Sequence, residues 1–276
     1  MRRLDTPAGP LCFEGGTKVM GVLNLSPESH NTQTVATTVP AALELAARYR
    51  EWGVEIIDVG AQSSRYDVPT LDVDEEIRRL VPAVEALSAE GHLVSVDTWK
   101  PEVARAGVAA GAAIVNDTGG LGDPEMRRVV AESGAAAIVV YVEGVNPHAV
   151  DEIDVRPDKA AVTARWLAER VAALEADGID RLIVDPGIAI NYPGDYAGYT
   201  RMQIDVIRCL DVIRAVGPPV LVPIPRKQED HRVMAYITLA VEHGADIIRV
   251  HDVAEACDLV RLLTDVSGGA GRLRTS

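Results

Sequence analysis

The sequence predicts a single-domain α/β protein built as a (β/α)8 TIM barrel that spans residues 1–276. One unit recurs along the chain: a glycine, a short apolar strand, a polar strand end and an amphipathic helix, as in "GVEIIDVG", "GAAIVNDTGG" and "GADIIRVHD". The strands are apolar and rich in β-branched residues, which is typical of parallel strands buried on both faces. Eight such units in 276 residues match the size of this barrel.

Each unit contributes one strand, and the eight strands are expected at about residues 19–25, 55–61, 93–98, 113–118, 136–142, 181–186, 219–224 and 246–251. Eight helices are expected after them; "VPAALELAARYREWG", for example, has helical periodicity and ends on Gly53, a suitable C-cap. A doubly wound open sheet is the alternative, but no G-x-G-x-x-G follows the first strand and the even spacing favours the barrel. Residues 1–16 are expected to form an N-terminal extension and residues 268–276 a C-terminal tail.

Composition excludes several classes of partner. The net charge of −14 argues against binding nucleic acid or an anionic membrane surface, because both need a surplus of Lys and Arg. No apolar run is long enough to span a membrane, and the N-terminus does not resemble a secretory signal. The three cysteines, Cys12, Cys209 and Cys257, show no disulfide or metal spacing and indicate a reduced, cytoplasmic setting. The alanine-rich composition favours a bacterial source.

Function is expected at the carboxyl ends of the strands, where TIM barrels carry their active sites. Asp97, Asn116, Asp185 and Lys227 follow the third, fourth, sixth and seventh strands. Two carboxylates, an amide and an ammonium in one bowl would match a flat heterocycle with an amino group, ring N–H groups and a carbonyl, such as a pterin or purine. Each residue also has a plainer interpretation: Asp97 as a helix cap, Asp185 as a turn residue, Asn116 as a partner of backbone groups and Lys227 as a solvated cation.

A second, cationic group surrounds Asn24 at the end of the first strand. Arg65, Arg249 and His251 belong to the second and eighth units, which flank the first strand in a closed barrel. Such a group can receive a diphosphate, and the Asn24 amide oxygen can coordinate a bridging Mg²⁺. The alternatives are a surface arginine for Arg65 and, for His251, a core histidine or an ion pair with Asp252. Two long polar loops, at about 26–38 and 61–71, border this group.

These residues lie in motifs that resemble dihydropteroate synthases. The motifs are "MGVLNLSPES", "IIDVGAQSSR", "SVDTWKPEVA", "IVNDTGG", "DPGI", "PVLVPIPRK" and "IIRVHDV", in the family's order from about residue 19 to 265. The resemblance implies a barrel enzyme of folate biosynthesis that joins 4-aminobenzoate to dihydropterin-CH2-diphosphate, releases pyrophosphate and forms a homodimer. It implies that Asp97, Asn116, Asp185 and Lys227 hold the pterin. The implied catalytic residues are Asn24, Arg65, Lys227, Arg249 and His251. All of these except Lys227 are implied to bind the diphosphate, and Asn24 is also implied to coordinate Mg²⁺.

The sequence departs from the family where the second substrate is expected. The divergent acceptor-site positions are Ser26, Pro27, Glu28, His30, Ser64, Ile190, Pro225 and Arg226. The predicted function is therefore a dihydropteroate synthase-like transfer to 4-aminobenzoate or a related amine. The alternatives are a relative that transfers the pterin-CH2 group to a different acceptor, and a pterin-binding protein without catalytic activity.

Overall fold

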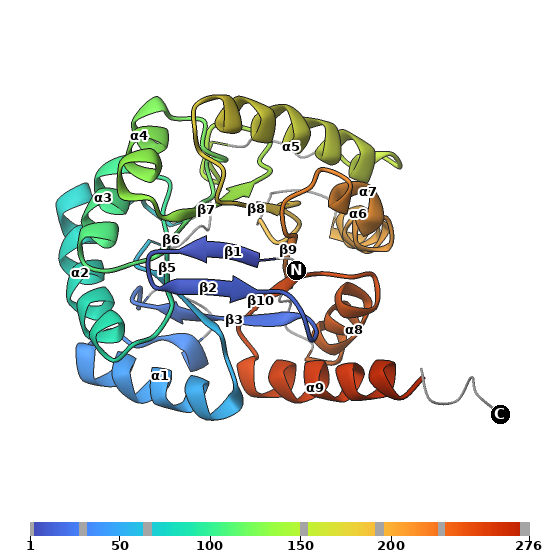
Figure 1. Ribbon diagram of the computed structural model, residues 1–276, viewed down its shortest axis with the longest axis horizontal. Helices are drawn as coiled ribbons and strands as arrows, with labels where there is room; N and C mark the ends of the chain where they lie inside the picture. Colours follow the sequence, from blue (N-terminus) through green and yellow to red (C-terminus); the bar gives the residue numbers. More distant parts are fainter. Residues whose placement is uncertain are drawn as a thin grey trace.

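The computed structural model describes residues 3–27, 32–62, 68–149, 154–190, 196–225 and 230–270. Eight parallel strands form one sheet in the order β8-β7-β6-β5-β4-β3-β10-β9. A parallel bridge between Val184 and Val220 joins the first and last of these strands, so the sheet closes into the predicted barrel (Figure 1). The strands are β3 (Lys18–Asn24), β4 (Ile56–Gly60), β5 (Val94–Asp97), β6 (Ile114–Asp117), β7 (Ala136–Val140), β8 (Leu182–Asp185), β9 (Leu221–Pro223) and β10 (Ile247–Val250).

Helices pack around the outside of this barrel (Figure 1). They are α1 (Val39–Trp52), α2 (Val73–Ala89), α3 (Pro101–Ala109), α4 (Pro124–Ser133), α5 (Lys159–Ala176), α6 (Tyr196–Arg208), α7 (Leu210–Arg214), α8 (Asp230–Glu242) and α9 (Val253–Ala270). The sequence predicts one helix after β8, whereas the structure has two: α6 ends at Arg208 and α7 begins after Cys209. Gly53 ends α1 in the predicted left-handed conformation, with φ of 89°. No described helix has the length and hydropathy needed to cross a membrane.

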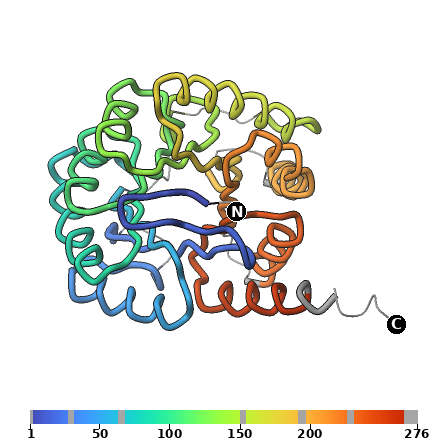
Figure 2. Tube along the Cα trace, viewed as in Figure 1, coloured from blue at the N-terminus to red at the C-terminus, as the bar shows by residue number. Residues whose placement is uncertain are grey.

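The chain ends carry structure that the sequence did not predict in detail. Within the predicted N-terminal extension, β1 (Arg3–Thr6) and β2 (Gly9–Cys12) form an antiparallel hairpin that crosses the barrel in projection (Figure 2). Leu4 and Leu11 are buried in the same apolar cluster as the inward residues near the strand starts, so the hairpin covers the amino-terminal end of the barrel. At the other end of the chain α9 continues to Ala270, past the residue where a tail was expected.

The barrel interior changes character along the strands. Alternate strand residues face the same side, so each inward apolar residue near a strand start is followed two positions later by another inward residue. Four isoleucines of the interior cluster are followed in this way by polar residues: Ile56 by Asp58, Ile114 by Asn116, Ile183 by Asp185 and Ile247 by Arg249. The apolar half stabilises the barrel, and the polar half forms the floor of its carboxyl-terminal mouth.

Candidate active site

Arg249 occupies the centre of the polar floor. Its Nε donates to Asp58 Oδ2 and one terminal nitrogen donates to Asp97 Oδ2, both at 2.6 Å. The three residues come from β10, β4 and β5, so these contacts join strands that are far apart in sequence. Asp58 is fully buried, whereas 17% of the Asp97 side chain is exposed. The guanidinium therefore holds two carboxylates in fixed positions at the barrel mouth.

Asn116 extends this cluster along β6. Its amide nitrogen donates to Asp58 Oδ2 at 3.1 Å. Asp58 Oδ1 and Asn116 Oδ1 are both buried and have no hydrogen-bond partner among the described residues. A buried acceptor without a partner is energetically costly, and such groups in native proteins usually receive a ligand or water. The floor thus presents two acceptors that are suited to N–H donors of a bound molecule.

Asp185 is placed by a tight turn after β8. Its Oδ1 accepts a hydrogen bond from the Gly187 backbone nitrogen at 2.6 Å. Gly187 has φ of 68°, and a Cβ there would lie 1.9 Å from the Tyr141 carbonyl oxygen. Only glycine fits this position, because both the backbone conformation and the close approach exclude a side chain. The turn role expected for Asp185 is therefore present, and it fixes a buried carboxyl at the floor.

The floor has perturbed acid–base properties. Burial raises the pKa of Asp97 to about 7, against the opposing effect of Arg249. Burial likewise raises the pKa of Asp185 to about 7, against the hydrogen bond from Gly187 and the charge of Arg249. Burial alone would lower the pKa of Arg249, but Asp58 and Asp97 more than offset this, so its pKa lies above the usual value. Near neutral pH the floor holds a permanent cation and carboxyls close to their titration point.

A second cluster lies on the rim beside the end of β3. Asn24 Nδ2 donates to Thr34 Oγ1 at 2.8 Å, and Thr34 Oγ1 lies 3.3 Å from His251 Nδ1. Thr34 belongs to the short 3₁₀ helix η1 (Thr32–Thr34) and is 1% exposed. We call Asn24, Thr34 and His251 the rim triad. It brings together two of the residues that the sequence predicts for diphosphate binding.

The base of the second long loop is tied to the barrel. Gln62 Oε1 accepts from the Leu71 backbone nitrogen at 2.5 Å, and Gln62 Nε2 donates to the Pro69 carbonyl at 3.4 Å. Lys100 Nζ donates to the Leu71 carbonyl at 2.6 Å and pairs with the fully buried Glu76 at 2.7 Å. These contacts hold together the two ends of the segment that contains Arg65.

The described site residues lie where the sequence predicts them, at the carboxyl ends of the strands. Asp97 does not cap α3, because that helix has Lys100 at its N-cap and Asp97 binds Arg249 instead. Arg249 contacts the carboxylates of the floor and so lies with the predicted pterin residues. Four of the acceptor-site positions are described. Pro27 is exposed, and the other three are buried: Ser26, Ile190 and Pro225. The predicted residues Glu28, His30, Ser64, Arg65, Arg226 and Lys227 lie outside the described residues.

Two residues of the site were not singled out from the sequence. Asp58 is the only charged residue in the apolar strand "IIDVG". Because a buried charge in such a strand needs a partner, this pattern could have identified Asp58 as a site residue. Thr34 gave no such signal, because a threonine in a polar loop is unremarkable until the fold places it against Asn24 and His251.

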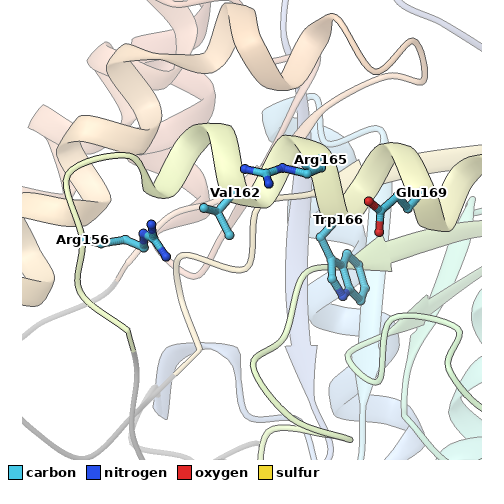
Figure 3. A pocket seen from close by; sticks show the side chains of 5 residues that line it. All are labelled: Arg156, Val162, Arg165, Trp166 and Glu169. Carbon is cyan, nitrogen blue, oxygen red and sulfur yellow. The ribbon is translucent and has the colours of Figure 1, made fainter.

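One pocket lies beside α5 and the segment that precedes it (Figure 3). It has a volume of about 290 Å³ and is lined by Arg156, Val162, Arg165, Trp166 and Glu169. Arg156 is already paired with Asp158 at 2.5 Å and with Asp154 at 3.3 Å. Its charge is therefore satisfied locally, and the pocket is not part of the candidate active site.

Residues 20–251 match the protein family described as pterin binding enzymes. The barrel and its polar mouth thus belong to the class of pterin-binding barrel enzymes. The dihydropteroate synthase of Synechocystis sp. is 31% identical over 275 residues, which cover 93% of each chain. This chain belongs to the dihydropteroate synthase family.

Two further relatives extend the comparison. The crystal structure of Burkholderia cenocepacia dihydropteroate synthase complexed with 7,8-dihydropteroate has a TM-score of 0.82, with 28% identity over 98% of each chain. A probable bifunctional folylpolyglutamate synthase/dihydropteroate synthase of Haloferax volcanii is 38% identical over 257 residues, 88% of this chain. This chain spans about a third of the length of such bifunctional relatives, 30% of the Haloferax volcanii protein.

Proposed function

We propose that this protein condenses dihydropterin-CH2-diphosphate with 4-aminobenzoate and releases pyrophosphate, as a step of folate synthesis. The observation that carries this proposal is the polar floor at the barrel mouth, where Asp58, Asp97, Asn116 and Asp185 surround Arg249. The proposal also draws on the family to which the chain belongs and on the Burkholderia cenocepacia relative, whose structure contains 7,8-dihydropteroate.

The floor suits the pterin ring. A pterin presents an amino group and ring N–H groups along one edge, and these need acceptors. Asp58 Oδ1 and Asn116 Oδ1 are buried acceptors without a partner among the described residues, and Asp185 is a buried carboxyl on the same floor. A carboxylate that receives two such donors makes a strong, oriented pair. The predicted Lys227 ammonium would complete the set by donating to the ring carbonyl.

The rim triad suits the diphosphate and Mg²⁺. The Asn24 amide nitrogen is engaged by Thr34, so the amide oxygen is the atom that Asn24 can offer to a cation. Mg²⁺ prefers hard oxygen ligands and usually takes one or two from protein and the rest from phosphates and water. His251, Arg249 and the predicted Arg65 would donate to the phosphate oxygens. When bound, Mg²⁺ would supply additional neutralisation of the diphosphate charge.

The reaction needs positioning and charge stabilisation rather than an enzyme nucleophile. The bond between the pterin CH2 and the diphosphate oxygen breaks, and the electron pair leaves with pyrophosphate. The 4-aminobenzoate nitrogen forms the new bond to the CH2 carbon and loses one proton. Arg249 and the predicted Arg65 would stabilise the charge that grows on the leaving group. The floor orients the ring so that its π-system can spread the positive charge at the CH2 carbon.

A second candidate is transfer of the same pterin-CH2 group to a different amine. The observation that favours it concerns two of the four acceptor-site positions that are described: Ile190 and Pro225 are both buried and supply no hydrogen-bonding side chain. Proline also lacks a backbone N–H. An acceptor held by such residues would be selected by shape.

We also propose that the protein works as a homodimer in the cytoplasm of a bacterium. The net charge of −14 and the three cysteines, which lack any disulfide spacing, support a soluble, reduced setting. Size-exclusion chromatography with light scattering would test the dimer directly.

The function is tested by incubating the protein with dihydropterin-CH2-diphosphate and MgCl2, with and without 4-aminobenzoate. Pyrophosphate release is followed and the products are weighed by mass spectrometry. We expect a dihydropteroate mass only when 4-aminobenzoate is present. Pyrophosphate release without that product, in the presence of a panel of other arylamines, would favour the second candidate. Absence of pyrophosphate release under all conditions would contradict both.

A further inference from the structure

We infer that Thr34 is a positioning residue that sets Asn24 and His251 as one unit for the diphosphate. This inference rests on the proposed function. Its physical basis is that one buried hydroxyl contacts the side chains of both residues: 2.8 Å to Asn24 Nδ2 and 3.3 Å to His251 Nδ1. Neither residue is a sequence neighbour of the other, so Thr34 connects the end of β3 to the end of β10.

The hydroxyl orients the Asn24 amide. An Asn side chain can present either its oxygen or its nitrogen in a given direction, and the choice is made by hydrogen bonds. Thr34 Oγ1 accepts from Nδ2, so the amide oxygen is turned away from Thr34. A cation or a Mg²⁺-bound diphosphate then meets an oxygen rather than an NH2 group. Without the hydroxyl the two orientations would be closer in energy.

The same hydroxyl orients the imidazole of His251. Thr34 Oγ1 lies 3.3 Å from Nδ1, and a hydroxyl can serve either tautomer of the ring, because it has one proton to donate and a second lone pair with which to accept. Because Nε2 lies on the other side of the five-membered ring, the contact at Nδ1 sets the direction in which Nε2 points. One residue therefore positions the side chains of both Asn24 and His251.

The position of Thr34 does not depend on its hydroxyl. The Ala36 backbone nitrogen donates to the Asn24 carbonyl at 2.8 Å, and a parallel bridge pairs Asn24 with Val35. In addition, Gln33 Nε2 donates to Asp252 Oδ1 at 2.5 Å. These contacts hold η1 against the ends of β3 and β10. A valine at position 34 would keep the volume and these backbone bonds, so the substitution removes the hydroxyl alone.

The test compares three variants of the full chain. Thr34→Val removes the hydroxyl, Thr34→Ser restores it, and Thr32→Val makes the same change on the same 3₁₀ helix at an exposed position. Calorimetric titration measures the affinity for inorganic pyrophosphate at fixed MgCl2, and kcat/KM is measured for dihydropterin-CH2-diphosphate. NMR spectra record the side-chain amide signals of Asn24 in the absence of ligand.

We expect Thr34→Val to weaken pyrophosphate binding and kcat/KM by about 10- to 100-fold, as is typical when a residue that orients a ligating group is lost. In Thr34→Ser both quantities should stay within about 3-fold of the wild type, because serine keeps the hydroxyl. A 10-fold change would correspond to the loss of a whole hydrogen bond. Thr32→Val should have no effect. The Asn24 amide signals should shift or broaden in Thr34→Val only.

Three results would overturn the inference. One is wild-type pyrophosphate affinity in Thr34→Val. Another is an equal loss in Thr34→Ser and Thr34→Val, which would assign the effect to packing. The third is unchanged Asn24 signals in Thr34→Val. Failure of the proposed function itself looks different, because the wild type would then neither bind pyrophosphate nor release it from the pterin diphosphate.

Discussion

The floor and the rim of the barrel mouth are both polar, yet they are built on opposite principles. In the floor, Arg249 holds Asp58 and Asp97 at 2.6 Å, and Asp58 is fully buried. In the rim, Thr34 holds Asn24 and His251 at 2.8 and 3.3 Å without a formal charge on either Thr34 or Asn24. The floor side chains come from strands in fixed register, whereas Thr34 comes from the short 3₁₀ helix η1 between β3 and α1.

Because of this difference, substitutions in the floor and in the rim should affect folding and ligand binding to different degrees. Charges buried in the floor depend on one another, because a buried ion that loses its partner keeps its desolvation cost. Removing a floor residue should therefore affect folding and binding together. Thr34 and Asn24 carry no charge, so the loss of their hydrogen bond leaves no buried ion without a partner, and changes there should affect the ligand and leave folding nearly intact.

The largest effect is expected for Arg249→Met. This change leaves Asp58 and Asp97 facing each other without a counter-charge, and we expect the free energy of unfolding to fall by about 3–5 kcal/mol. Urea unfolding at pH 7.5 measures it. Arg105→Met is the matched control, since Arg105 forms an exposed ion pair with Glu132 at 3.1 Å and should contribute less than about 1 kcal/mol. Equal losses in the two variants would contradict the comparison.

A strong effect on binding is expected for Asp58→Asn. Asp58 Oδ2 accepts from both Arg249 and Asn116, and its Oδ1 is available to a ligand. Loss of a charged acceptor should cost about 2 kcal/mol of pterin binding, or roughly 30-fold in Kd. Fluorescence titration with 6-hydroxymethyl-dihydropterin measures this. Asp123→Asn is the control, because Asp123 caps α4 on the surface and Asn caps a helix equally well. Unchanged affinity in Asp58→Asn would remove Asp58 from the site.

The pH dependence of stability tests the same comparison through a slope rather than through the loss of a side chain. In the folded protein the pKa of Asp97 and of Asp185 is raised to about 7, whereas an unfolded Asp titrates near 3.9. Between these values the folded state retains protons that the unfolded state has lost. The free energy of unfolding of the ligand-free protein should therefore fall as pH rises from about 4 to about 7, by at most about 1.4 kcal/mol per pH unit for each group, and then level off.

The variant that tests this slope is Asp97→Asn, which removes one of the two groups. Chemical denaturation at a series of pH values should show a slope of about half the wild-type value. A slope identical to that of the wild type would show that Asp97 titrates in its ordinary range.

The smallest effect is expected for Gln33→Ala, which removes the exposed contact with Asp252. Because η1 is also held by backbone bonds to Asn24, the free energy of unfolding should change by less than about 0.5 kcal/mol. The side-chain amide signals of Asn24 should stay as in the wild type. A shift of those signals would mean that the surface contact, rather than the backbone, positions Thr34.

The sequence by itself determined the barrel and the side of the barrel on which the site lies. Buried parallel strands need β-branched, apolar residues, and amphipathic helices need apolar residues at a period of about 3.6 together with capping residues. Each βα unit could therefore be predicted from its own segment of the sequence. All eight strands lie at the expected positions, from Lys18–Asn24 to Ile247–Val250. Because parallel strands end on the same side, polar residues after them had to meet at one mouth.

Only the tertiary structure decided which of those residues touch. Asp58 and Arg249 are 191 positions apart, and nothing local to either predicts a 2.6 Å contact. Thr34 became part of the site because a returning loop places it between Asn24 and His251. The terminal hairpin was missed for the same reason: Leu4 and Leu11 are too few to define a core of their own and are buried only against the barrel interior. Local patterns encode elements, whereas contacts between distant elements depend on the closed geometry of the whole chain.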